Sequence, residues 1–578
     1  MKQTFLFHRH PSAVSQVLSF QRTKKTVVIS DNLPFSRHFR KSRNDPPLQM
    51  IRTSVFKTDQ TKTLTWLVQR CKSLNQLKEL HAHLLKFDLP DNPASIGPLL
   101  SFAATSKNGS FFSYARSIFR YLRKRNAFVY NTMIRGYVQS NPPVSSVLCY
   151  LDMLESGIAA NNYTFPPLIK ACTLMGSDSV PVGRLVHAHV AKSGFCDDPF
   201  VVSALIEFYS SACNLETARK LFDRSSNKDV VIWTSLIDGY GKAGDVESAR
   251  ELFEKMPFRN VISWSALIAA YSRVGDFKEV LRLFSQMQEM VIKPNESVLV
   301  SVLTACAHLG AVTQGLWVHS YAKRLKFESN PILATALIDM YSKCGFVELA
   351  LSVFNDMPVK DARAWNAMIS GVALNGDGRK SLKLFHEMVN HGIRPTETTF
   401  VVVLTACTHA GLVMEGLSLF AEMGSVYNIE PRMEHLACVV DLLARSGLVG
   451  EAEEFVEKKM GGIEGADVNV WGALLSACRV YGNVELGNRI WRRLAEMGIN
   501  DCGSHVLSYN MYREAGWEHE AKQVRKLISD AGMMKKPGCS VIELDGIVEE
   551  FVAGDFRHPK AEEMYKLLNS FPRVSHSE

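Results

Sequence analysis

The segment TALIDMYSKCGFVELALSVFNDMP, Thr335–Pro358, has the pattern of two short amphipathic helices separated by a turn at Cys344–Gly345. Leu337, Ile338 and Tyr341 give the first half an apolar face at helical spacing, and a similar face runs along the second half. Related segments begin at Thr234, Ser265 and Asn366, and weaker copies begin at Asn131 and Ser203. The chain therefore repeats one helical hairpin many times.

The repeats follow a long period of 101 residues. Trp264 and Trp365 are this far apart, and so are Cys306 and Cys407. Units of 35, 35 and 31 residues fill the period, at 261–295, 296–330 and 331–361. One hairpin cannot bury both of its apolar faces, whereas stacked hairpins can. The pattern predicts an all-α superhelical solenoid with a long concave surface.

The residue pattern of the repeats indicates a family. Their period alone does not, because tetratricopeptide repeats have nearly the same length. The segments VYNTMIRGYVQ (129–139), VIWTSLIDGYGKAGDVESARELFEKMP (231–257) and ARAWNAMISGVALNGDGRKSLKLFHEMVNHGIRP (362–395) resemble pentatricopeptide repeats (PPRs). The alternation of long and short units resembles the plant-specific PLS subfamily, over about residues 61–571. The resemblance implies a right-handed α-solenoid of tandem helix–turn–helix repeats.

The chain divides into five expected parts. Residues 1–45 form a transit peptide or disordered segment, 61–126 degenerate repeats, 127–467 the PPR array, 468–545 an E motif and 546–576 an E(+)-like motif. The expected units of the array are 127–161, 162–198, 199–229, 230–260, 261–295, 296–330, 331–361, 362–396, 397–432 and 433–467.

The first 30 residues contain five Lys or Arg and no Asp or Glu, together with several serines. This composition is typical of an organellar transit peptide, and a disordered basic tail is the alternative. It does not separate mitochondrion from chloroplast, and the mitochondrion is slightly preferred. No membrane partner is expected, because the uncharged stretch 297–322 contains Ser, Thr, Gln, His and two glycines and is better described as two buried helices.

The cysteines and histidines show no metal-binding pattern. None of the 12 cysteines forms a C-x-x-C pair, and no metal, cofactor or catalytic residue is expected. Five of the cysteines share one position of the repeat, where a small buried apolar residue is expected in a reducing compartment: Cys71, Cys172, Cys306, Cys407 and Cys478. Three histidines are expected to be packing residues with satisfied hydrogen bonds: His81, His187 and His319.

The resemblance implies binding of single-stranded RNA, with one base read per repeat by two or three side chains. In the family the fifth and last residues of a unit choose the base. The fifth place holds Asn131, Ser203, Thr234, Ser265, Thr335 and Asn366. The last place holds Asn161, Asp229, Asn260, Asn295, Asp361 and Thr396. For any one of these residues the alternative role is a helix N-cap or a turn.

The family's rule assigns a base to each pair. A hydroxyl with Asp favours guanine, a hydroxyl with Asn favours adenine, and Asn in the fifth place favours a pyrimidine. Pro166, Val300 and Val401 cannot hydrogen-bond through their side chains and are expected to pack or space. The implied core, 5′ to 3′, is pyrimidine, any base, G, A, A, any base, G, pyrimidine.

The C-terminal part resembles the E extension of plant organelle RNA-editing factors, and Asp545–Gly546 between short β-type runs predicts a hairpin. In many relatives a cytidine deaminase domain follows, which needs H-x-E and a C-x-x-C pair for zinc. His576-Ser577-Glu578 fits H-x-E only by chance, and no C-x-x-C is present. A DYW-type deaminase or other editing factor acting in trans, recruited from Val468 onward, is the expected partner.

Three functions compete at this point. The first is a non-enzymatic recognition factor for C-to-U editing of organellar RNA. The second is a factor for RNA stability, splicing or translation, and the third is a protein-binding helical scaffold. The net charge of +8 is compatible with an anionic partner. The basic run 120–126, RYLRKRN, is either a solvated surface or a phosphate contact.

Overall fold

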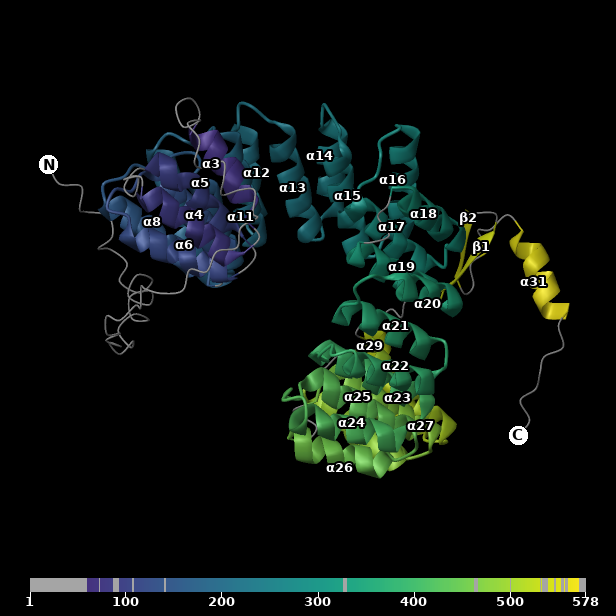
Figure 1. The fold of residues 1–578 in the computed structure, drawn as a ribbon. Helices are drawn as coiled ribbons and strands as arrows, with labels where there is room; N and C mark the ends of the chain where they lie inside the picture. The colour runs from purple at the N-terminus through teal and green to yellow at the C-terminus, as the bar shows by residue number, and fades with distance from the viewer. Residues whose placement is uncertain are drawn as a thin grey trace. The chain divides into compact units, whose positions relative to one another are not determined.

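The computed structural model describes residues 60–71, 73–86, 93–106, 109–139, 142–325, 330–461, 466–498, 501–530, 532, 539–544, 547–552, 556 and 560–570. The chain forms two compact units, Met1–Val274 and Gly275–Glu578. Figure 1 labels many of their helices and strands, coloured from purple near the N-terminus to yellow near the C-terminus. The expected transit peptide at 1–45, the turn at Asp545–Gly546 and the tripeptide His576–Glu578 lie outside the described residues.

The described residues of the first unit are almost wholly helical. The elements are α3 (Gln60–Gln69), α4 (Leu74–Lys86), α5 (Pro93–Thr105), α6 (Gly109–Tyr121), α7 (Ala127–Gln139), α8 (Val144–Glu155), α9 (Phe165–Leu174), the 3-10 helix η2 (Ser177–Ser179), α10 (Val180–Lys192), α11 (Pro199–Ser211), α12 (Leu215–Arg224), α13 (Val230–Lys242), α14 (Val246–Lys255) and α15 (Val261–Val274).

The second unit continues the helical series and adds two strands. The helices are α16 (Phe277–Glu289), α17 (Glu296–Leu309), α18 (Val312–Arg324), α19 (Pro331–Lys343), α20 (Val347–Asp356), α21 (Ala362–Leu374), α22 (Gly378–Asn390), α23 (Glu397–Ala410), α24 (Val413–Ser425), α25 (Met433–Arg445), α26 (Val449–Met460), α27 (Val468–Val480), α28 (Val484–Glu496), α29 (Cys502–Glu514), α30 (Glu518–Asp530) and α31 (Ala561–Ser570). The strands are β1 (Cys539–Leu544) and β2 (Ile547–Val552). The predicted all-α solenoid with a C-terminal hairpin is confirmed.

The pair α19–α20 shows how the sequence specifies one repeat. Asn330 caps α19 by accepting from the backbone N–H of Ile332, and Pro331 supplies a first residue that needs no hydrogen-bond partner. Gly345 adopts φ +84° in the turn, a conformation that a residue with a Cβ rarely takes. The buried faces of α19 and α20 then include Tyr341 and Phe354, as the spacing predicts.

The first helices of consecutive repeats pack directly on one another. In the first unit the series is α5, α7, α9, α11, α13 and α15, and in the second it runs from α17 to α29 in odd numbers. These first helices lie very close to one another. A Cβ at Gly239 would lie 2.3 Å from Ser210 Oγ, and one at Gly371 would lie 2.1 Å from Ser342 Oγ. Both glycines are therefore required by the stacking distance between first helices.

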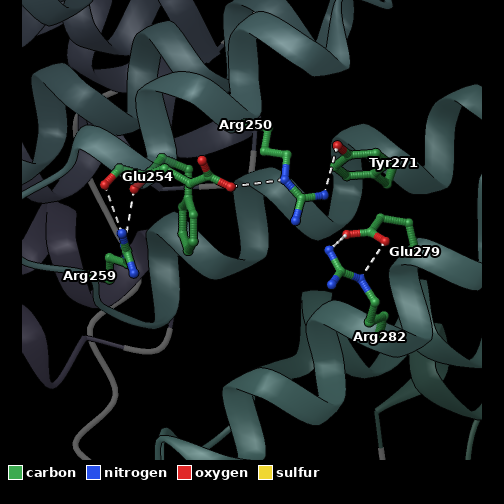
Figure 2. Close-up of polar contacts among 7 residues, drawn as sticks. Arg250, Glu254, Arg259, Tyr271, Glu279 and Arg282 are labelled. Carbon is green, nitrogen blue, oxygen red and sulfur yellow. Dashed lines mark hydrogen bonds and ion pairs between the residues drawn. The ribbon is translucent and has the colours of Figure 1, made fainter.

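A recurring aromatic contact joins the second helix of one repeat to the first helix of the next. Phe253 of α14 meets Trp264 of α15 edge-on, with ring centroids 4.8 Å apart. The Arg259 guanidinium lies 5.0 Å from the centre of the Phe253 ring and donates to the carbonyl oxygens of Phe253 and Glu254 (Figure 2). A basic residue, a phenylalanine and an aromatic partner are grouped in the same way at Arg125–Phe119–Tyr130, Lys228–Phe222–Trp233 and Lys360–Phe354–Trp365.

The C-terminal hairpin pairs its strands antiparallel, from Cys539 opposite Val552 to Leu544 opposite Ile547. It lies beside α18, whose N-cap Ala311 offers no side-chain acceptor. The Glu543 carboxylate accepts from the backbone N–H of Thr313 through both oxygens, at 3.1 and 3.2 Å. The hairpin therefore supplies a negatively charged cap to a helix 230 residues away in sequence.

The expected cysteine slot is buried in four of its five members. Cys172, Cys306, Cys407 and Cys478 are fully buried, whereas Cys71 near the start of the described chain is half-buried. Burial raises the pKa of the Cys172, Cys306 and Cys407 thiols to about 12, so these groups are protonated at neutral pH.

The three packing histidines are hydrogen-bonded, as predicted. The Nδ1 atoms of His81, His187 and His319 lie 2.8–2.9 Å from the hydroxyls of Tyr114, Tyr209 and Tyr341, respectively. The uncharged stretch 297–322 forms parts of α17 and α18. Within the described part of the chain, no helix has the length and apolar character needed to cross a membrane.

The aromatic contact between repeats leads to a stability prediction. Phe253 is 4% exposed, so Phe253→Ala should destabilise its part of the array by about 3 kcal/mol. Hydrogen exchange should show lost protection in α14 and α15. Phe258→Ala is the matched control, because Phe258 is 80% exposed and its loss should change stability by less than about 0.5 kcal/mol. Equal effects of the two substitutions would contradict the importance of the contact.

Candidate nucleic-acid interface

The six predicted fifth-place residues lie at equivalent positions in the first helices. Each is the fifth residue of its helix, in α7, α11, α13, α15, α19 or α21. Asn131, Thr234 and Asn366 are 8–9% exposed, and Ser203, Ser265 and Thr335 are half-buried. All six lie near the N-terminal ends of helices that stack in order within each unit, three of them largely buried and three half-buried.

The fifth-place hydroxyls are oriented by their own helices. Thr335 Oγ1 donates to the Pro331 carbonyl at 2.7 Å, and Thr234 Oγ1 lies 2.9 Å from the Val230 carbonyl. Ser203 Oγ donates to the Phe200 carbonyl at 3.1 Å. Because the hydroxyl proton is used internally, the oxygen lone pairs remain to accept from a ligand.

Five of the six last-place residues are N-caps of the following first helix, and Asn161 is the exception because Thr164 directly precedes α9. Asp229 Oδ1 accepts from the Ile232 N–H at 2.9 Å, Asp361 Oδ1 from the Ala364 N–H at 3.0 Å, and Asn260 Oδ1 from the Ser263 N–H at 3.1 Å. Asn295 and Thr396 cap α17 and α23 in the same manner. The alternative role that the sequence offered, helix capping, is therefore present at these five positions.

Capping uses one atom of each of these Asp and Asn side chains and leaves the other. In Asp229 and Asp361 the second atom is the carboxylate oxygen Oδ2, whereas in Asn260 and Asn295 it is the amide nitrogen Nδ2. Asp361 Oδ2 has one further contact, with Arg363 Nε at 3.3 Å on an exposed surface. The cap holds the side chain in place and presents an acceptor from Asp but a donor from Asn.

One predicted pair is in direct contact. Asn131 Nδ2 donates to Asn161 Oδ1 at 2.9 Å, and Thr164 Oγ1 donates to Asn131 Oδ1 at 2.7 Å. The fifth and last places of this unit are therefore adjacent in space. Asn366 differs from Asn131, because its buried Oδ1 has no hydrogen-bond partner among the described residues.

The two members of a predicted pair lie on neighbouring helices in some repeats, whereas in one pair they belong to different units. Thr335 lies on α19 and Asp361 caps the neighbouring helix α21, and Thr234 and Asn260 have the same relation on α13 and α15. Ser265 belongs to the first unit, and Asn295 belongs to the second. Pro166, Val300 and Val401, which are expected to pack or space, are half-buried in α9, α17 and α23.

The structure also reveals a row of exposed apolar side chains that the sequence analysis missed. They occupy the second place of five first helices, three residues before the fifth place and therefore on the same helix face. Their exposed fractions lie between 45% and 65%: Phe128, Phe200, Val231, Ile262 and Ile332. The sequence could have indicated this row, because a large apolar residue recurs at the same position of the repeat unit.

Two close relatives come from Arabidopsis thaliana. The chain is 45% identical over 501 residues to the pentatricopeptide repeat-containing protein At5g66520, covering 86% of this chain and 79% of the relative. It is 44% identical over 502 residues to the chloroplastic pentatricopeptide repeat-containing protein At2g42920, covering 86% and 89%. The chain belongs to the pentatricopeptide repeat family.

Family models locate the PPR segments and the C-terminal motif. The model of the E motif matches residues 481–543, which include α28, α29 and α30. The two PPR models match residues 128–158, 231–261, 259–308, 333–361, 360–409 and 398–425. The resemblance to an E-class PPR protein is therefore confirmed.

A solved PPR structure shares the fold. The crystal structure of the maize protein PPR10 in complex with an 18-nt psaJ RNA element superposes with a TM-score of 0.51 at 14% identity, covering 88% of this chain and 79% of that chain. At this identity the likeness shows the solenoid architecture. Among the described residues of the PPR chain, no group of three or more His, Cys, Asp or Glu is placed to hold a metal ion.

The capping role of the last place predicts a difference between two substitutions of Asp361. Asp361→Ala removes the acceptor of the Ala364 N–H and should destabilise the start of α21 by about 1 kcal/mol. Asp361→Asn retains Oδ1 and should cost only a few tenths of a kcal/mol. Chemical denaturation of the two variants measures this difference, and equal losses would show that the cap does not stabilise α21.

Proposed function

We propose that this PPR protein binds single-stranded RNA of a plant organelle in a sequence-specific way and selects a cytidine for C-to-U editing. The observation that supports RNA reading most directly is the paired placement of the fifth and last residues, seen as a contact in Asn131–Asn161. Such pairs recur along stacked first helices, which suits a ligand with regularly spaced, unpaired bases.

The atom left by each cap gives the base choice a chemical basis. On its Watson–Crick edge guanine offers N–H donors at N1 and N2, which suit Oδ2 of Asp229 and Asp361. Adenine offers an acceptor at N1, which suits Nδ2 of Asn260 and Asn295. Ser203 and Thr335 therefore pair with the guanine-type residues, and Thr234 and Ser265 pair with the adenine-type residues.

Pyrimidines suit the units with Asn in the fifth place. The Oδ1 atom of Asn366, which has no partner within the described part of the chain, can accept from the N3–H of uracil or the N4 amino group of cytosine. Asn131 offers the same groups once a base replaces Asn161 or Thr164 as its partner. Asn161 and Thr396 complete these two pairs.

The exposed apolar row supplies contacts to base faces. Ile332 precedes Thr335 by one helical turn, so an aliphatic surface lies beside the polar atoms that meet the base edge. Packing against a base face tolerates any base, whereas hydrogen bonding to its edge discriminates. The second place therefore adds affinity, and the fifth and last places add specificity.

A single substitution tests this assignment. Asp361→Asn keeps the cap and exchanges an acceptor for a donor, so preference at the second guanine of the core should move to adenine, by roughly tenfold for one base contact. Binding of RNAs that differ only at this base measures the shift. Asp377→Asn is the matched control, because Asp377 caps the second helix α22 and should leave the base preference unchanged. Unchanged preference in Asp361→Asn would contradict base reading by this pair.

The E motif supports editing as the outcome of binding. This motif matches residues 481–543. We therefore propose that the segment from Val468 onward recruits a DYW-type deaminase or another editing factor in trans. In this proposal the repeat array supplies recognition of the RNA.

Organellar location is part of the same proposal. Relatives carry names that state chloroplastic or mitochondrial location, such as At2g42920 and the mitochondrial At2g22410, which is 39% identical over 459 residues and spans 79% of this chain and 67% of the relative. The basic, acid-free first 30 residues agree with import into either organelle.

A knockout line tests the editing step. Sequencing of mitochondrial and plastid transcripts should find one or a few cytidines unconverted, with a sequence upstream that fits the predicted core. Complete editing with altered transcript ends or introns would favour the stability, splicing or translation factor. Weak binding of single-stranded RNA without salt dependence would favour the protein-binding scaffold.

A further inference from the structure

The segment around Asn131 carries positive charge and no negative charge. The 60 residues from Asn92 to Leu151 contain seven Lys or Arg and no Asp or Glu. Three of the cations, Arg123, Lys124 and Arg125, lie in the short loop between α6 and α7, and Arg120 lies in the last turn of α6. The segment therefore contains no carboxylate of its own that could pair with these cations.

Three of these cations are available to an external anion. Arg120, Arg123 and Lys124 are exposed and make no hydrogen bond or ion pair with any residue that the structure describes. Arg125 differs, because it pairs with Asp152 at 3.1 Å and lies over the Phe119 ring. The loop cations Lys228, Arg259 and Lys360 of later repeats are likewise held by rings and carbonyl oxygens.

The loop lies at the same edge of the array as the proposed reading residues. Asn126 ends this loop and caps α7 through the Val129 N–H at 3.0 Å, as Asp229 and Asp361 cap α13 and α21. Asn131 follows in the second turn of α7. Arg123 and Lys124 therefore come two or three residues before a last-place position, next to the first pair that reads a base.

The repeat that ends at this loop has no fifth-place side chain that could hydrogen-bond to a base. Its first helix α5 begins at Pro93, as α19 begins at Pro331, so Gly97 takes the place that Thr335 has in α19. A Cβ at residue 97 would lie 2.9 Å from Phe128 Cε1. The Phe128 ring thus occupies the space of a fifth-place side chain, while remaining half exposed.

An exposed aromatic ring accompanies the cations. Tyr121, between Arg120 and Leu122, is 85% exposed. Aromatic rings beside basic residues bind single-stranded nucleic acid by stacking on bases and neutralising phosphates, without a need for a particular base. Together with Gly97, this arrangement suits a nucleotide that is held but not identified.

We propose that Arg120, Tyr121, Arg123 and Lys124 bind the RNA nucleotides immediately 5′ of the core, through phosphates and one base face, whatever their sequence. The proposal rests on the proposed function, in which the RNA runs 5′ to 3′ along the repeats from Asn131. The surface would extend the contact beyond the read bases and add a salt-dependent component to binding.

The test uses the full chain and three RNAs: the eight-nucleotide core, the core with six nucleotides added 5′, and the core with six added 3′. The 5′ extension should strengthen binding roughly tenfold, equally for A, U and C tracts. Arg120→Gln/Arg123→Gln/Lys124→Gln should remove this gain and lower the slope of log affinity against log salt by about 2. Binding of the core and of the 3′-extended RNA should be much less affected.

The control variant removes the same charge elsewhere. Lys459→Gln/Arg525→Gln/Lys526→Gln alters three exposed cations of α26 and α30 and should keep the gain from the 5′ extension. Equal affinity for core and 5′-extended RNA, or equal behaviour of the two triple variants, would overturn the phosphate surface. A core with both guanines changed to cytosine tests reading alone, and affinity equal to that of the original core would instead overturn the proposed function.

Discussion

The edge-on contact between a phenylalanine of one repeat and an aromatic residue of the next sets the geometry on which the other features depend. It buries the second helix of each repeat against the following first helix, as Phe253 and Phe354 do against Trp264 and Trp365. A hairpin without such a neighbour would expose both rings to water, at a cost of several kcal/mol. First helices are consequently held in a regular row within each unit, and this regularity is what a ligand with evenly spaced bases requires.

Helix capping connects this stacking to the proposed chemistry. Each first helix needs an acceptor for its free N–H groups, and in most repeats, though not at α9 or α25, the last residue of the preceding repeat supplies it. Asp361 meets this need with Oδ1 and retains Oδ2, which contacts the exposed Arg363, so one side chain stabilises α21 and keeps a second acceptor at the surface. Because the rotamer is fixed by the cap, the second atom points in a defined direction before any ligand arrives.

The sequence was sufficient for the features that follow from periodicity and local chemistry. The period of 101 residues, the turn glycine Gly345 and the buried cysteine slot predicted the helix pairs and their faces. It did not predict contacts between side chains on different helices, such as Asn131 with Thr164 or Glu543 with Thr313, because these depend on packing of distant segments. The exposed apolar second place was missed because a large apolar residue in a first turn ordinarily indicates core.

Capping alone does not identify a reading residue. Asn126, Asp198 and Asn330 cap α7, α11 and α19 as effectively as Asp229 and Asp361 cap their helices, yet their repeats carry Gly97, Pro166 and Val300 in the fifth place. The folding requirement limits the last place to short acceptors, whether or not a base is read. Recognition of a particular base must therefore depend on the side-chain atom that is not used for capping and on a polar fifth-place side chain. Repeats that lack this side chain can contribute affinity without specificity.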